Sequence, residues 1–203
     1  MRPEEIEQAS MRTIAAEMEP WTGPAENLDV VKRVIHTTAD FEFQKNLRFT
    51  PDAVGKARTA LKNGATVVTD TMMAAAGISK KSCAALGVSV VCRMSDPDVA
   101  KEAVSRGVTR AVVSMERAVA QTPEAIFAIG NAPTALLSIC DLVKSGRLNP
   151  EIVIGVPVGF VNVVQSKELI MTADVPYIVA RGRKGGSNVA AAICNALMYL
   201  MGR

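Results

Sequence analysis

From about residue 50 onward, short runs rich in aliphatic and β-branched residues alternate with longer segments of helical periodicity. The runs predict five strands, at residues 65–69, 88–92, 125–129, 151–155 and 176–180. Alternating strands and helices favour right-handed crossovers and a parallel sheet with helices on both faces. We therefore expect an α/β fold with three layers and a mostly parallel five-stranded sheet.

Residues that commonly begin and end helices mark the segments between these strands. Thr50-Pro51 predicts a helix with proline at its first position, which ends at Asn63-Gly64. Asp96-Pro97 predicts a second helix, and others are expected to end near Gly146 and to begin at about Ser187. The first 45 residues predict one or two helices before the sheet. Without a linker or repeat, residues 1–203 are expected to form a single domain.

The composition argues against several classes of protein. Aliphatic side chains dominate and aromatic residues make up only 4%, which suits helices packed closely on a buried sheet but not base stacking. A net charge of +3 does not by itself indicate nucleic-acid binding. The four cysteines are widely spaced without a C-x-x-C pair, so neither a metal site nor a disulfide is expected.

Two segments of the sequence indicate where in the cell the protein is located. The chain begins with acidic residues where a signal peptide needs an apolar run. The most apolar stretch, residues 152–164, is too short to cross a membrane and is interrupted by glycine and proline. We expect a soluble cytoplasmic protein.

Ligands of parallel α/β sheets usually bind beyond the carboxyl ends of the strands. In this chain those positions are the loops that start near Asp70, Arg93, Gly130, Pro157 and Arg181.

The only histidine, His36, ends a segment with helical periodicity. The valine and isoleucine residues of 28–36 fall on one face of that helix, whereas Arg33 and His36 share the opposite face. A histidine can act as a general acid or base because its ring ionises near neutral pH. The alternative is a solvent-exposed histidine without a role.

The segment 181–188 combines three positive charges, three glycines and the expected start of a helix. These features together favour an anion site that includes Arg183, Lys184 and Ser187. The alternative is a flexible turn whose charges are solvated. The segment lacks the spacing of a dinucleotide or P-loop motif, so no nucleotide cofactor is expected.

Polar residues also follow two other expected strands. Asn131, in the segment 130–134, is either a turn residue or a ligand contact. The segment 69–71 is either a helix cap or a ligand-facing polar cluster. Met72, Met73 and Met115 are expected in the core or in the lining of a pocket.

These motifs, in this order, resemble the precorrin-8X methylmutase family, also called cobalt-precorrin-8 methylmutase. The likeness extends from about residue 3 to the C-terminus. The matching stretches are residues 6–10, 31–40, 68–72, 130–136, 153–161, 166–168 and 182–193. Ala39 stands where the family often has glycine, a difference that we expect to be harmless.

The resemblance implies an isomerase of cobalamin biosynthesis. Its reaction is a 1,5 shift of a methyl group from C-11 to C-12 of precorrin-8X, or of its cobalt-bearing counterpart. The product is hydrogenobyrinic acid or cobyrinic acid. Such a migration needs no redox cofactor, which agrees with the missing nucleotide motif.

The resemblance also implies roles for individual residues. His36 corresponds to the family's acid–base histidine, and Ser10, Arg33 and Arg110 correspond to substrate-binding positions. It further implies a homodimer with the large tetrapyrrole substrate near the subunit interface. A ring of basic residues around an apolar pocket suits the carboxylate arms of such a substrate.

Two other functions are compatible with the same motifs. A non-catalytic tetrapyrrole carrier would have the same basic loop and pocket, but would not need His36 for any conversion. An enzyme that binds nucleotide phosphates at residues 181–188 would be stabilised by a nucleotide and not by a corrinoid.

Overall fold

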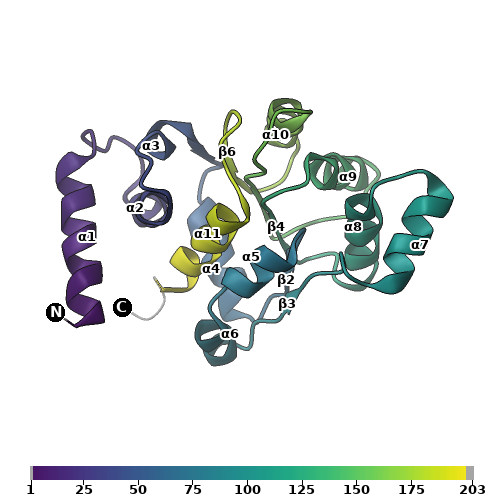
Figure 1. Cartoon of the computed structure of the whole chain (residues 1–203), viewed down its shortest axis with the longest axis horizontal. Coiled ribbons are helices and arrows are strands. Elements are labelled where there is room, and N and C mark those ends of the chain that lie inside the picture. Colours follow the sequence, from purple (N-terminus) through teal and green to yellow (C-terminus); the bar gives the residue numbers. More distant parts are fainter. Residues whose placement is uncertain (1, 200–203) are drawn as a thin grey trace.

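The structure, a computed structural model, describes residues 2–199 and is organised around one twisted sheet (Figure 1). The strands are β1 (Leu47–Phe49), β2 (Val67–Thr69), β3 (Val90–Val91), β4 (Ile126–Ile129), β5 (Ile152–Gly155) and β6 (Tyr177–Ala180). Their order across the sheet is β1-β6-β5-β4-β2-β3, and all neighbours are parallel except β1, which is antiparallel to β6.

Helices connect and cover these strands. They are α1 (Pro3–Glu17), α2 (Ala25–Thr38), α3 (Phe43–Asn46), α4 (Ala53–Lys62), α5 (Met72–Gly77), α6 (Lys80–Leu86), α7 (Pro97–Arg106), α8 (Arg110–Gln121), α9 (Pro133–Lys144), α10 (Val163–Met171) and α11 (Ser187–Tyr199).

The two faces of the sheet bury two separate apolar clusters, because side chains alternate along each strand. Ile126 and Ala128 of β4 face the cluster formed with α2, α4 and α11. Phe127 and Ile129 face the cluster formed with α8, α9 and α10. Helices α2 and α8 therefore lie on opposite sides of the sheet, which confirms the expected α/β class.

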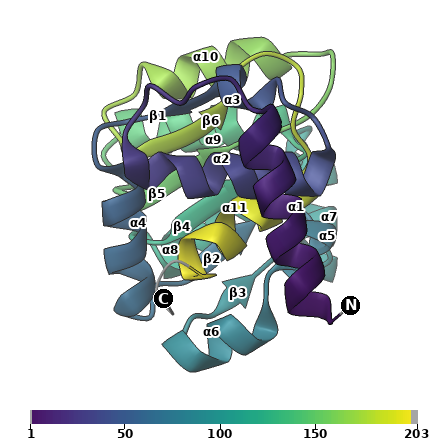
Figure 2. The same cartoon turned by 90° about the vertical axis from the view of Figure 1, so that its left-hand side faces the viewer.

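One further helix lies outside each of these layers. Helix α1 crosses the outer surface of α2, and α7 packs against the outer surface of α8 (Figures 1 and 2). The N-terminal helices were expected, and the buried face of α2 holds Val30, Val31, Val34 and Ile35, as the sequence predicts. The opposite face of α2 thus remains available for Arg33 and His36.

All five expected strands are present with slightly different ends, but the sheet has a sixth strand, β1. It is only three residues long and lies at the edge, so it leaves too short a pattern to read. The helix expected from Thr50-Pro51 begins instead at Ala53, because Thr50 pairs with Tyr177 and Asp52 takes a left-handed conformation at φ 56°.

The methionines divide between core and surface. Met115 is buried in the core, whereas Met72 and Met73 are 54% and 71% exposed, so the core alternative does not hold for these two. They open α5 immediately after β2 and therefore lie at the carboxyl edge of the sheet. Within residues 2–199, no helix is both long and apolar enough to cross a membrane.

Candidate active site

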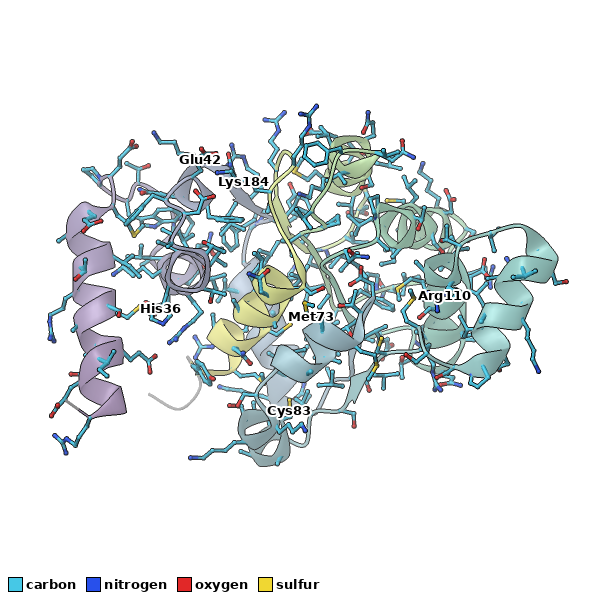
Figure 3. All side chains as sticks on the ribbon, in the orientation of Figure 1. His36, Glu42, Met73, Cys83, Arg110 and Lys184 are labelled. Atoms are coloured by element: carbon cyan, nitrogen blue, oxygen red, sulfur yellow. The ribbon has the colours of Figure 1, made fainter. Side chains whose placement is uncertain are left out.

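His36 lies in the last turn of α2, on the side that faces α1 (Figure 3). It is exposed at a pocket of about 460 Å³. The pocket is built from α1, from the end of α2 and from the segment that follows. It is lined by Ile6, Ala9, Ser10, Thr13, Ile14, Glu17, Ile35, His36, Ala39 and Phe41. Two of the sequence-predicted residues, Ser10 and His36, therefore line one largely apolar pocket.

Arg33 lies one turn before His36 but is held by other residues. Its Nη2 lies 2.6 Å from Oε1 of Glu7, and its guanidinium lies 5.2 Å from the ring centre of Tyr199. Its side chain is only 16% exposed. These contacts join α1, α2 and α11, so Arg33 supports the pocket in the free protein and must share its charge to bind a substrate carboxylate.

Ion pairs hold most of the positive charges of the basic loop between β6 and α11, where the sequence predicts an anion site. Nε of Arg181 lies 2.8 Å from Oε1 of Glu168. Nζ of Lys184 lies 2.6 Å from Asp40 and 3.0 Å from Glu42, and its hydrogen bond holds the pKa of Asp40 below its ordinary value. Two of the three charges are thus already paired, because acidic residues distant in sequence reach this loop.

Arg183 is the member of this loop that remains available. Its side chain is exposed and its guanidinium lies 5.6 Å from the ring centre of Phe160. A guanidinium held over an aromatic ring keeps its donors free for a carboxylate. Arg183 is therefore the best-placed anion-binding group of the loop.

Asp70 organises the carboxyl edge of the sheet. Its buried carboxylate accepts hydrogen bonds from the backbone N–H groups of Gly130, Asn131 and Ala132, at 2.8, 2.8 and 2.6 Å. Burial raises its pKa, and the three hydrogen bonds oppose that shift. The carboxylate occupies the position that an external anion would take at this turn.

Three other polar residues at this edge, Thr71, Ser187 and Asn131, differ in their contacts. Thr71 caps α5 by accepting from the N–H of Ala74 at 3.0 Å, so the helix-cap interpretation of this segment is correct for Thr71. Its hydroxyl also lies 2.8 Å from Oγ of Ser187, which is buried. The side chain of Asn131 is exposed, so it is the one of these groups that faces solvent.

Arg110 lies apart from His36 and Lys184 (Figure 3). It is the first residue of α8, on the opposite side of the sheet from α2. Its side chain is exposed and makes no hydrogen bond or ion pair with any residue between 2 and 199.

Lys167 is a further residue of this region that was not predicted from the sequence, although it lies in a motif that carries the family resemblance. Lys167 is 0% exposed, and its Nζ donates to the carbonyl oxygens of Gly182 and Lys184, both at 2.8 Å. Burial lowers its pKa to about 8. A signal was present, because Val163, Lys167 and Ile170 share one helical face and the two apolar members are buried.

Comparisons with known proteins agree with these motifs. The family model for precorrin-8X methylmutase (CbiC) matches residues 5–200. A cobalt-precorrin-8 methylmutase from Priestia megaterium is 42% identical over 98% of this chain and 89% of its own length. A precorrin-8X methylmutase from Pseudomonas aeruginosa is 37% identical over 95% of this chain and 93% of its own length.

A solved structure shows the same likeness in three dimensions. The crystal structure of a precorrin-8X methylmutase from Thermus thermophilus has a TM-score of 0.91 and 37% identity, and covers 97% of this chain and 95% of its own. The match over nearly the whole chain favours an isomerase over a carrier or a nucleotide-dependent enzyme. The chain belongs to the precorrin-8X methylmutase family of cobalamin biosynthesis.

Proposed function

We propose that this methylmutase moves a methyl group from C-11 to C-12 of precorrin-8X, or of its cobalt-bearing counterpart, with His36 as the acid–base group. The observation that carries this proposal is the position of His36, which is exposed and lines the α1–α2 pocket together with Ser10. A general acid must reach the reacting atoms, and an exposed imidazole on a rigid helix meets that condition.

We propose that His36 protonates the conjugated ring and takes the proton back after the methyl shift, because an isomerisation has no net uptake of protons. Protonation by His36 favours the rearranged conjugation of the product, and apolar walls such as Ile6 and Phe41 suit the body of the macrocycle. A pocket of about 460 Å³ suits a drug-sized ligand, whereas a tetrapyrrole with acetate and propionate arms is larger. Part of the substrate therefore extends beyond the α1–α2 pocket.

The other proposed contacts differ in how readily they meet the substrate. Arg183 and Asn131 are exposed and are proposed to bind carboxylate arms directly. Arg33 and Lys184 are ion-paired in the free protein and are proposed to share their charge with the substrate. Ser10 is proposed as a contact within the pocket. Ser187 is buried and bonded to Thr71, so its proposed contribution is through the start of α11.

We further propose that the chain forms a homodimer in which a second copy completes the site. The support is the separation of Arg110 from His36 by the whole sheet, together with the free guanidinium of Arg110. Apolar side chains at the carboxyl edge, including Phe160 at 84% and Val161 at 77% exposure, offer surface for a partner or for the macrocycle.

We also infer that the chain acts as one methylmutase domain, since the family match spans residues 5–200. Turnover without a redox cofactor or metal, an absence of nucleic-acid binding and a cytoplasmic location remain predictions.

The test is the visible spectrum of the protein incubated with precorrin-8X and, separately, with its cobalt counterpart. The His36→Ala variant should lower the turnover rate by about 10²- to 10⁴-fold, as expected for the loss of a positioned acid. Thr37→Ala is the matched control, since Thr37 is the next exposed residue of α2 and its hydroxyl bonds only the Arg33 carbonyl.

Equal conversion by the native protein and by His36→Ala would remove His36 from the reaction. Binding of both substrates without any conversion by the native protein would indicate a tetrapyrrole carrier instead.

A further inference from the structure

Lys167 is a buried cation that the proposed reaction does not use. Its side chain is 0% exposed, and among residues 2–199 no carboxylate forms an ion pair with it. An ammonium group without a counter-ion is costly to bury, and its pKa falls to about 8 for that reason. Its compensation comes from the carbonyl oxygens of Gly182 and Lys184, each 2.8 Å from Nζ.

The loop that these carbonyls belong to is fixed from two sides. On one side lies the Lys167 ammonium. On the other, the N–H of Gly159 donates to the carbonyl of Arg183 at 3.2 Å, and the N–H of Gly186 donates to the carbonyl of Val156 at 2.9 Å. A Cβ atom at Gly185 would lie 2.1 Å from the Val156 oxygen, so the two backbones are in direct contact.

This arrangement directs the loop's carbonyl groups inward and its charged side chains outward. Arg183 is exposed over Phe160, and Lys184 reaches Asp40, two residues beyond the end of α2. The backbone of the loop depends on its bonds to Lys167, Gly159 and Val156 for a defined conformation. Gly182 and Gly186 have positive φ angles of 86° and 136°, and glycine has few conformational restraints of its own.

We propose that Lys167 is a positioning residue of the methylmutase, which holds the 182–184 backbone so that Arg183 is presented to a carboxylate arm of the substrate. This inference rests on the proposed function for its substrate. A charged donor is suited to the task because charge-assisted hydrogen bonds are stronger than neutral ones, and one ammonium can bind two carbonyls at once. Holding the loop before binding reduces the entropy lost when the substrate binds.

A second link between α10 and this loop is weaker. Glu168 and Arg181 form an ion pair whose side chains are 42% and 55% exposed, so solvent screens it. Of the two links between α10 and the loop, the buried bonds of Lys167 are therefore the stronger.

The experiment compares Lys167→Met with the native protein in two measurements. In steady-state turnover of precorrin-8X, KM should rise about tenfold while kcat changes much less, because a substrate contact is misplaced and His36 is not. In hydrogen exchange of the free protein, the amides of Gly159 and Gly186 should exchange at least about tenfold faster. Lys167→Gln retains a neutral donor and should recover part of both effects.

The matched control is Ser166→Ala. Ser166 is also fully buried on α10, but its hydroxyl bonds only the Val163 carbonyl within the helix, at 2.9 Å. This variant should leave KM and both amide exchange rates unchanged, even if it lowers the melting temperature.

A double variant tests the route through Arg183. If Lys167 acts by positioning Arg183, then Lys167→Met should raise KM much less in an Arg183→Ala background than in the native protein. Full additivity of the two changes, or faster amide exchange with an unchanged KM, would overturn the proposal.

Separate results would disprove the proposed reaction and the positioning role of Lys167. If the native protein converts neither precorrin-8X nor its cobalt counterpart, the proposed function is wrong. Unchanged exchange of Gly159 and Gly186 in Lys167→Met would overturn the positioning role whatever the substrate is.

Discussion

Ala39 ends α2 in a conformation that costs energy for any residue with a Cβ atom. Its φ and ψ are 53° and 29°, in the left-handed region, where an L-residue is less stable than glycine by about 1–2 kcal/mol. Glycine has a larger loss of backbone entropy on folding, which offsets about 0.5–1 kcal/mol of that gain. We expect Ala39→Gly to raise the free energy of unfolding by about 0.5–1 kcal/mol, measured by urea denaturation.

The control for this prediction is Ala16→Gly, at an exposed helical position of α1. There the same substitution should lower the free energy of unfolding by about 1 kcal/mol. Destabilisation by both variants would show that the left-handed conformation of Ala39 carries no cost.

Asp70 shows how one buried carboxylate can organise a loop. Asp70→Asn places an amide NH₂ against the N–H groups of residues 130–132, so at least one of them loses its acceptor. We expect the variant to lose about 1–3 kcal/mol of the free energy of unfolding, as for other buried groups left unpaired.

The same carboxylate gives a pH dependence with a definite sign. Because the pKa of Asp70 is raised in the folded state, the folded protein binds more protons than the unfolded chain at pH values above about 4. The contribution of this group to stability therefore falls as pH rises from about 4 through the folded pKa. The stability difference between the native protein and Asp70→Asn should shrink over that range, in urea denaturation at a series of pH values. A growing difference would contradict the raised pKa.

At the scale of elements, α7 is held to the rest of the molecule by few apolar contacts. Val99, Ala103 and Val113 form a small cluster between α7 and α8. Around it, Arg117 pairs with Asp98 and Glu102, and Arg106 pairs with Glu102 and Glu116. Such surface networks are screened by salt, so α7 should be the less stable partner of this pair.

We expect Arg117→Gln to accelerate the hydrogen exchange of the α7 amides without changing that of β4 or β5, and high salt to have the same effect on the native protein. Lys101→Gln is the matched control, since Lys101 is exposed on α7 and forms no ion pair with any described residue. Equal exchange in Arg117→Gln and Lys101→Gln would show that the ion pairs do not hold α7.

At the scale of the whole molecule, the proposed dimer predicts that two inactive variants complement each other. If His36 of one copy and Arg110 of the other act on one substrate, a mixed dimer of His36→Ala and Arg110→Ala has one intact site and one doubly altered site. After equal amounts of the two variants exchange subunits, about a quarter of the native activity should return, because half of the dimers are mixed and each has one active site.

The control is each variant mixed with itself, and sedimentation should give the mass of a dimer for all samples. Mixtures that stay inactive, although subunits exchange, would place both residues of a working site in one chain. A monomeric mass for the active native protein would exclude the dimer.

Elements with a local residue pattern could be predicted from the sequence alone. The five parallel strands could be read from short apolar runs, and the buried face of α2 from the spacing of its valines, which also placed His36 on the outer face. The motifs around His36, Asn131 and Ser187 also indicated the family. The buried face of α8 also follows a pattern in the sequence, since Ala111, Met115, Ala118 and Val119 have helical spacing.

Contacts between residues far apart in the sequence could not be predicted in this way. The pairing of Lys184 with Asp40, of Asp70 with residues 130–132, and of Lys167 with the carbonyls of the basic loop joins elements far apart in sequence. Strand β1 likewise exists because β6 offers it a partner. Periodicity records which side of an element is buried, because burial repeats along the helix or strand. Periodicity does not indicate which charge or backbone group of another element an exposed or buried side chain will contact, since that depends on how separate elements pack.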